Sequence, residues 1–148
     1  MSPKHLSVTG LVIGAAAILA GCSAAAPEQA PPAQIVPVPG SPVPKLLLTD
    51  HAVHRLGIVT QPVRDETTAG RRAGPEVIPY SAVVYDHDGS TWTYVNTAAR
   101  TYERKPITVA GIDGDIAQLS AGPPAGTEVV TVGAAELLGT EYNISGEE

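Results

Sequence analysis

The residues that could bind a metal ion are histidines with aspartates close to them in the chain. His51 and His54 are three residues apart in a segment expected to form a helical turn, so both imidazoles could face one ion beside Asp50. Two imidazoles do not complete a site, and polar side chains on an exposed helical face are the ordinary explanation of this pattern. The sequence therefore leaves both readings of this pair open.

A second metal candidate is the segment Asp86-His87-Asp88-Gly89-Ser90. Aspartate bonds to its own backbone in tight turns, and glycine tolerates positive φ, so a hairpin turn explains every residue here except His87. After Met1 the chain has no methionine, which excludes a thioether copper site. We expect no metal site and no cofactor, with His51, His54 and His87 as the weak candidates.

Motifs of catalysis are missing from the sequence. Ser81 lies in Pro79-Tyr80-Ser81-Ala82, which is not a G-x-S-x-G nucleophile elbow. There is also no H-E-x-x-H pattern, and no glycine-rich loop ends in Gly-Lys-Ser or Gly-Lys-Thr. We therefore expect a protein that is not an enzyme.

Aromatic and basic residues of the strand-rich region are candidates for docking a partner. Trp92 and Tyr94 share one face of a strand by its period of two. Core packing is the ordinary explanation of such a pair, and the alternative is an exposed patch for docking, since Trp and Tyr are favoured interface anchors. Arg100, Arg104 and Lys105 form a basic group that could steer docking or guard a solvated strand edge. These five side chains are the predicted docking residues.

The single cysteine, Cys22, stands where lipidation chemistry requires a thiol. A basic start at Lys4 is followed by an apolar run from Leu11 to Leu19, which is the pattern of a secretory signal peptide. That run is shorter than the roughly 20 residues needed to span a bilayer. Leu19-Ala20-Gly21-Cys22 resembles the bacterial lipobox, which implies that residues 1–21 are removed and Cys22 becomes the lipidated N-terminus. We therefore expect a protein of the bacterial cell envelope, lipid-anchored to a membrane and facing the periplasm or the exterior.

Composition narrows the partners of the mature chain. The formal net charge of −6 becomes −7 when Lys4 is removed with the signal peptide, so nucleic acid is a poor partner. With Cys22 lipidated, no thiol is left for a disulfide. Stability must then come from a core of Val, Ile, Leu and Ala with one Trp and five Tyr.

Proline content divides the mature chain into a linker and a domain. We expect residues 22–44 to form a Pro/Ala-rich linker, residues 45–142 a β-domain and residues 143–148 an acidic tail. Prolines exclude a helix or a central strand from the linker, which would reach at most roughly 70 Å as a semi-rigid spacer. They are Pro27, Pro31, Pro32, Pro37, Pro39, Pro42 and Pro44.

Periodicity predicts mostly strands within the domain. A helical turn over 51–56 has Thr49 or Asp50 as its cap and Gly57 at its end, and a second short turn over 134–138 ends at Gly139. Residues 65–75 are polar and predict a loop. Strands are expected over 58–63, 77–85, 91–95, 101–110, 116–119 and 128–132. This spacing predicts an all-β fold, a small barrel or sandwich with one or two short helical turns.

Two separated segments together resemble one protein family. The first contains Leu48-Thr49-Asp50 and Arg55-Leu56-Gly57-Ile58-Val59-Thr60, and the second begins at Ile78-Pro79-Tyr80-Ser81-Ala82-Val83-Val84 and continues to Ala134. They are similar to the two parts of the membrane-proximal domain in periplasmic adaptors, the HlyD-like membrane fusion proteins of RND-type efflux systems. The resemblance covers residues 46–139 and implies the same β-domain here.

The chain departs from that family in its middle. In a full adaptor a barrel, a split lipoyl-like domain and usually a helical hairpin separate the two segments, whereas here only residues 64–76 do. The resemblance therefore implies a reduced adaptor or accessory subunit that docks on an RND-type transporter. The alternative is a stand-alone envelope lipoprotein that binds a small ligand or a metal.

Overall fold

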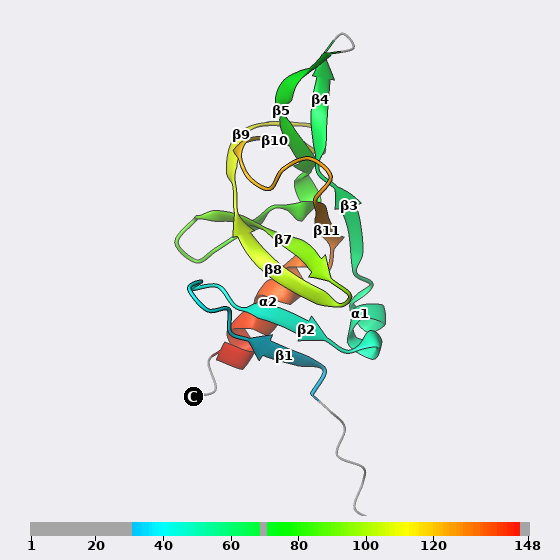
Figure 1. Cartoon of the computed structure of the whole chain (residues 1–148), viewed down its shortest axis with the longest axis vertical. Coiled ribbons are helices and arrows are strands. Elements are labelled where there is room, and N and C mark those ends of the chain that lie inside the picture. The colour runs from blue at the N-terminus through cyan, green and yellow to red at the C-terminus, as the bar shows by residue number, and fades with distance from the viewer. Residues whose placement is uncertain (1–30, 69–70, 146–148) are drawn as a thin grey trace, which may run out of the picture.

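The computed structural model describes residues 31–68 and 71–145, with side chains for residues 31–66 and 74–142. Within these residues the strands form two sheets, and the prediction of an all-β fold with short helices is confirmed (Figure 1). Neither sheet closes into a barrel: β1 and β3 are the edges of the larger sheet, and β4 and β9 are those of the smaller one. The expected closed barrel is therefore not formed, and the fold consists of two open sheets.

The larger sheet has the order β1-β2-β8-β7-β11-β3, with the short strand β6 also paired to β7. Its neighbouring strands are antiparallel. The strands are β1 Ala33–Val36, β2 Lys45–Leu48, β3 Val59–Pro62, β6 Val84–Tyr85, β7 Thr91–Ala98, β8 Thr101–Pro106 and β11 Glu128–Val132.

The smaller sheet has the order β4-β5-β10-β9 and is also antiparallel. Its strands are β4 Arg64–Thr68, β5 Arg71–Pro79, β9 Thr108–Asp113 and β10 Ile116–Ala121. The hairpin of β4 and β5 projects from one end of the molecule, and the described chain begins near the other end (Figure 1).

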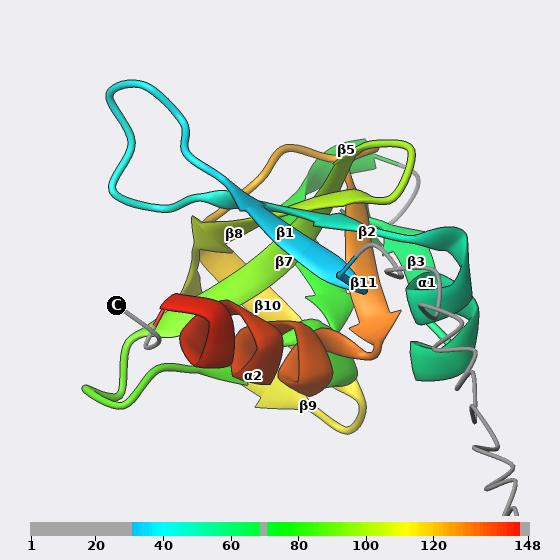
Figure 2. The same cartoon turned by 90° about the horizontal axis from the view of Figure 1, so that it is seen from below.

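Two α-helices and one 3₁₀ turn complete the fold: α1 Asp50–Leu56, η1 Tyr80–Ala82 and α2 Ala134–Ser145. The predicted boundaries of α1 are confirmed, because Thr49 Oγ1 accepts a hydrogen bond from the Ala52 N–H at 3.2 Å and Gly57 adopts φ +62°. Helix α2 crosses one face of the larger sheet (Figure 2). The larger sheet thus has α2 on one face and the smaller sheet packed against the other.

Each face of the larger sheet is the wall of a separate hydrophobic core. The helix-side core contains Leu46, Tyr94 and Leu137, all fully buried. The sheet-side core contains Ile78, Val129 and Leu119 between the two sheets. Strand β11 serves both cores, because Val130 faces the first and Val129 the second.

Proline stands at every passage of the chain between the two sheets. Pro62 ends β3 before β4, Pro79 ends β5 before η1 and β6, and Pro106 ends β8 before β9. The return from β10 to β11 runs through Pro123 and Pro124. Proline lacks the N–H that continues a strand ladder, which accounts for the strand ends at Pro62, Pro79 and Pro106. Strand β10 ends at Ala121, and Pro123 and Pro124 keep the following loop out of either ladder.

These passages correct two of the predicted strands. The expected strand over 101–110 is two strands in different sheets, broken at Ile107 after Pro106. The expected strand over 77–85 is interrupted by η1 after Pro79. The hairpin at Gly89, which has φ +83°, is confirmed, with Val84 opposite Trp92.

The predicted loop over 65–75 is wrong for the residues that the structure describes there, because residues 65–68 lie in β4 and residues 71–75 in β5, and these two strands pair. The predicted end of the second helix at Gly139 is also wrong, because α2 continues to Ser145. Its contacts with the sheet stabilise the helix through a glycine, and it includes residues 143–145 of the expected tail.

The expected boundary between linker and domain at residue 45 is wrong as well. Ala33–Val36 form the edge strand β1, paired with β2 from Ala33 opposite Leu48 to Val36 opposite Lys45. An edge strand tolerates flanking prolines because one side of its ladder is unpaired. The fold therefore includes Ala33–Val36, and Ala33 itself is buried in the helix-side core.

We predict that Ala33→Asp lowers the free energy of unfolding by about 2–3 kcal/mol, because it places a carboxylate in the helix-side core. Gln34→Asp is the matched control, since Gln34 is the exposed neighbour on the opposite face of β1. Urea unfolding followed by Trp92 fluorescence measures both. Equal stability of the two variants would contradict the assignment of residues 33–36 to the fold.

Candidate functional site

The structure separates the five predicted docking residues. Trp92 and Tyr94 do share one face of β7, but that face lies in the helix-side core. Tyr94 is fully buried and Trp92 is half-buried. The prediction that Tyr94 is a surface docking residue is therefore wrong, because the strand that carries it is covered by α2.

The basic residues do not form one cluster. Arg100 lies in the turn between β7 and β8 with φ +58°, and its Nη1 is 3.2 Å from Oδ2 of Asp50 at the start of α1. Arg104 is only 9% exposed and faces the helix side of the sheet. Lys105 is on the opposite face, where its ammonium group donates to Glu103. The alternation of β8 places Arg104 and Lys105 on different sides.

Arg104 is the centre of a buried polar network, which we call the α2 anchor and which comprises Asp86, Trp92, Tyr94, Arg104, Glu141 and Tyr142. Nη1 of Arg104 donates to Oδ2 of Asp86 at 2.6 Å, and Nη2 is 3.1 Å from Oε1 of Glu141. The other oxygen of Glu141, Oε2, accepts a hydrogen bond from the Tyr94 hydroxyl at 2.6 Å. One guanidinium thus connects the β6–β7 loop, strand β8 and helix α2.

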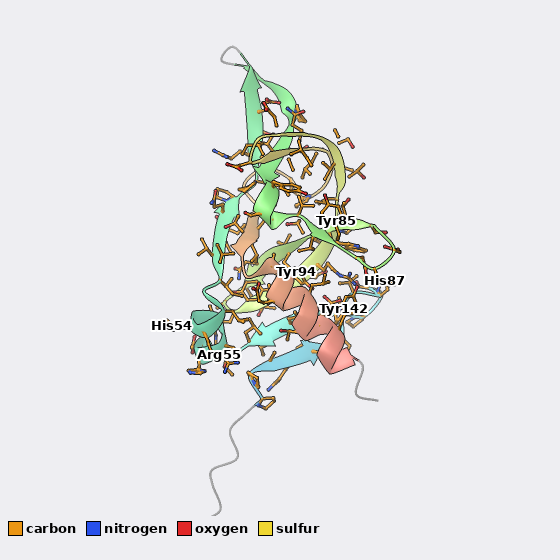
Figure 3. All side chains as sticks on the ribbon, turned by 180° about the vertical axis from the view of Figure 1, so that it is seen from behind. His54, Arg55, Tyr85, His87, Tyr94 and Tyr142 are labelled. Atoms are coloured by element: carbon orange, nitrogen blue, oxygen red, sulfur yellow. The ribbon has the colours of Figure 1, made fainter. Side chains whose placement is uncertain are left out.

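Aromatic rings enclose the guanidinium. Its central carbon lies 4.4 Å from the centroid of the Trp92 ring and 5.8 Å from that of Tyr142. The Tyr142 hydroxyl donates to Oδ1 of Asp86 and accepts from Nη1 of Arg104 at 3.4 Å. These contacts supply cation–π attraction where water is largely excluded. Figure 3 shows Tyr94 and Tyr142 at α2, with His87 beside Tyr142.

The β6–β7 loop holds Asp86 in position through its own backbone. The N–H of His87 donates to Oδ1 of Asp86 at 2.7 Å, and the Asp86 carbonyl accepts from the Gly89 N–H at 3.0 Å. Asp88 accepts from the Ser90 N–H at 2.8 Å. The interpretation of Asp86-His87-Asp88 as turn chemistry is therefore confirmed for both aspartates, and Asp86 additionally binds Arg104.

Electrostatics of the α2 anchor favour its charged form. The hydrogen bond from Tyr142 lowers the pKa of Asp86 well below its ordinary value, helped by the His87 N–H and by Arg104. Burial lowers the pKa of Arg104, but its bonds to Asp86, Glu141 and Tyr142 outweigh that effect and raise it. Burial and then the bond to Glu141 raise the pKa of Tyr94, so the phenol stays a donor.

The histidines lie at separate places. His51 and His54 are exposed on α1, and His87 is exposed in the β6–β7 loop on the opposite side of the molecule from His54 (Figure 3). His87 Nδ1 is 2.7 Å from Oδ1 of Asp86, and its ring meets that of Tyr142 edge-on. In the described part of the chain, no three His, Cys, Asp or Glu side chains come together as a metal site would require.

Sequence reasoning missed Asp86, Glu141 and Tyr142 as members of one network. A signal was present, because Ala134, Leu137 and Glu141 recur at helical spacing and continue past Gly139. The network positions α2 and the β6–β7 loop on the sheet. Arg104 has both of its carboxylate partners within the protein, so the arrangement holds these elements together.

The predicted lipidation site, Cys22, lies outside the described residues. None of the helices in the described ranges combines the length and apolar character needed to cross a membrane. Comparison with known proteins found no matching family model, no matching curated protein and no matching solved structure.

We predict that Arg104→Met lowers the free energy of unfolding by about 3 kcal/mol, because it leaves Asp86 of the β6–β7 loop and Glu141 of α2 without their counter-charge. Arg100→Met is the matched control: its ion pair with Asp50 is exposed, so the loss should stay below about 1 kcal/mol. The loss of stability in Arg104→Lys should fall between those of the two Met variants. Lysine keeps the positive charge but lacks the two guanidinium nitrogens that contact Asp86 and Glu141. Chemical denaturation measures all three, and similar losses for the Met variants would contradict the α2 anchor.

The lowered pKa of Asp86 predicts a pH dependence of stability. The unfolded chain takes up a proton at an ordinary aspartate pKa of about 3.9, whereas folded Asp86 resists protonation. The contribution of Asp86 is therefore complete above that pH and is lost as the pH falls below about 4. Asp86→Asn should reduce stability at pH 7 and flatten its decline on acidification, measured by urea unfolding from pH 3 to 7. Asp113→Asn, in the exposed β9–β10 turn, should keep the wild-type slope; a wild-type slope in Asp86→Asn would refute the linkage.

Proposed function

We propose that this protein is a lipid-anchored docking module of the bacterial cell envelope, non-enzymatic, and a reduced adaptor or accessory subunit of an RND-type efflux transporter. The observation that carries the proposal is how the two adaptor-like segments fit together. The first contributes β2, α1 and β3, and the second contributes η1 and the strands from β6 to β11. Within the larger sheet the two segments are directly joined, because β3 of the first pairs with β11 of the second.

The junction between the two segments supports the same reading. Arg64 and Val77 are directly opposite each other in the β4–β5 hairpin, so the chain leaves the domain and returns at neighbouring positions. In a full adaptor this junction would hold the barrel, lipoyl-like and hairpin domains. A short hairpin can replace such an insertion without disturbing the sheet, because its two ends already lie side by side.

The position of β1 shortens the proposed tether. Ten residues, 23–32, separate Cys22 from Ala33, which corresponds to about 30 Å if they are fully extended as polyproline. A spacer of the 22 residues first expected would have reached roughly 70 Å. The domain would therefore stay close to the membrane, as a membrane-proximal docking module requires, with the β4–β5 hairpin projecting from the end opposite β1 (Figure 1).

We predict that the intact lipidated chain co-purifies with an RND-type transporter of the same cell after mild solubilisation. Cys22→Ser should move the chain from the membrane to the soluble fraction while leaving its circular dichroism unchanged, because a lipid anchor and not the β-domain holds it there. Membrane fractionation and affinity capture followed by mass spectrometry measure both effects.

Arg55→Gln, on the exposed face of α1, is a control substitution that leaves the lipid attachment intact, so this variant should remain at the membrane. Repeated failure to recover a transporter with the wild-type chain would reject the adaptor role. A Cys22→Ser chain that stays membrane-bound and functional would mean that partner docking, and not the lipid, is the real anchor.

A further inference from the structure

An open pocket lies on the face of the larger sheet opposite α2. It occupies about 400 Å³ between the β10–β11 loop and strands β7 and β8, which is at the small end of the range for ligand pockets of about 300–1,000 Å³. Its walls are mainly apolar. They are formed by Val95, Lys105, Pro106, Gly122, Pro123, Pro124 and Thr127.

The loop over this pocket is fixed by hydrogen bonds at its far end. Val63 donates its N–H to the Thr127 carbonyl and accepts from the Gly126 N–H, both at 2.8 Å. Thr127 Oγ1 donates to the Pro124 carbonyl at 2.7 Å. At the near end a Cβ on Gly122 would lie 2.8 Å from Cδ1 of Leu119, so the loop packs directly on the sheet-side core. These contacts fix both ends of the β10–β11 loop, which forms one wall of the pocket.

Lys105, which lines the pocket, belongs to a charged group with the buried carboxylate of Glu103 and with Lys45. Glu103 is nearly buried; Oε1 accepts from the Lys105 ammonium group, and Oε2 is 3.8 Å from Nζ of Lys45. The two lysine side chains are 44% and 35% exposed, so their ammonium groups still reach solvent. The group carries one surplus positive charge in a chain whose overall charge is −6. An apolar pocket beside a surplus cation complements a ligand with an apolar body and one anionic end.

We propose that this pocket binds a small amphipathic carboxylate, with its aliphatic or aromatic body against the prolines and Val95 and its carboxylate at Lys105. The Lys105 ammonium group has three N–H donors, so it can bind the ligand while it donates to Glu103. Lys45 supports the site indirectly, because it offsets part of the negative charge of Glu103. This site is independent of the proposed docking on a transporter and can be tested without one.

The test uses the full chain carrying Cys22→Ser, which has no thiol to lipidate, with decanoate as the probe and calorimetric titration as the measurement. Decanoate should bind saturably, and decan-1-ol, of equal length without charge, about five-fold more weakly. Lys105→Gln should weaken decanoate by about the same factor and leave decan-1-ol unchanged. Added salt should weaken decanoate alone.

Arg55→Gln removes an equal charge from α1, outside the pocket, and should leave decanoate binding within two-fold of the parent chain. Lys45→Gln is a second variant that should also weaken decanoate, and circular dichroism checks the fold of each. The proposal is overturned if decanoate shows no saturable binding, if decanoate and decan-1-ol bind equally, or if Arg55→Gln weakens binding as much as Lys105→Gln. Loss of transporter co-purification would not affect this result.

Discussion

Burial of β7 on both of its faces is the constraint on which the rest of the structure depends. Tyr94 on one face and Thr93 on the other are fully buried. An antiparallel sheet usually leaves one face to solvent, but this strand needs a cover on each side. Helix α2 supplies one cover and the smaller sheet supplies the other, so the small domain contains two cores separated by a single strand layer.

This arrangement explains why polar groups are buried near the helix. The C-terminal half of α2 lies near the β6–β7 loop and the end of strand β8. Arg104 of β8 joins the three elements through its ion pairs with Asp86 of the loop and Glu141 of α2. Burying an ion pair is costly, and it yields little net stability compared with a packed apolar cluster. It does require defined partners, because Asp86 and Glu141 each bind a different nitrogen of the guanidinium. The α2 anchor therefore fixes where the helix lies on the sheet.

The face of the larger sheet opposite α2 is covered in a different way, by segments of the chain that cross to the smaller sheet. Four proline-containing passages carry the chain between the sheets, and in three of them a proline is the last residue of a strand. The last of these, the loop with Pro123 and Pro124, does not lie flat on the strands and leaves the pocket bordered by Lys105. The same passages place the β4–β5 hairpin between β3 and η1. The pocket and the projecting hairpin thus come from the way the chain changes sheets.

Local signals in the sequence determined the strand-rich fold, the capped helix α1 and the hairpin at Gly89, because each depends on residues that are neighbours in the chain. Alternation placed Trp92 and Tyr94 on one face of a strand for the same reason. The sequence did not reveal β1, since its prolines resemble a linker and only the pairing with β2 identifies an edge strand. Nor did it reveal that α2 continues past Gly139, that the polar segment 65–75 is a hairpin or that Arg104 is buried. Those features depend on contacts between residues far apart in the chain, such as Arg104 and Glu141, which are 37 positions apart. Only the tertiary structure brings such residues together.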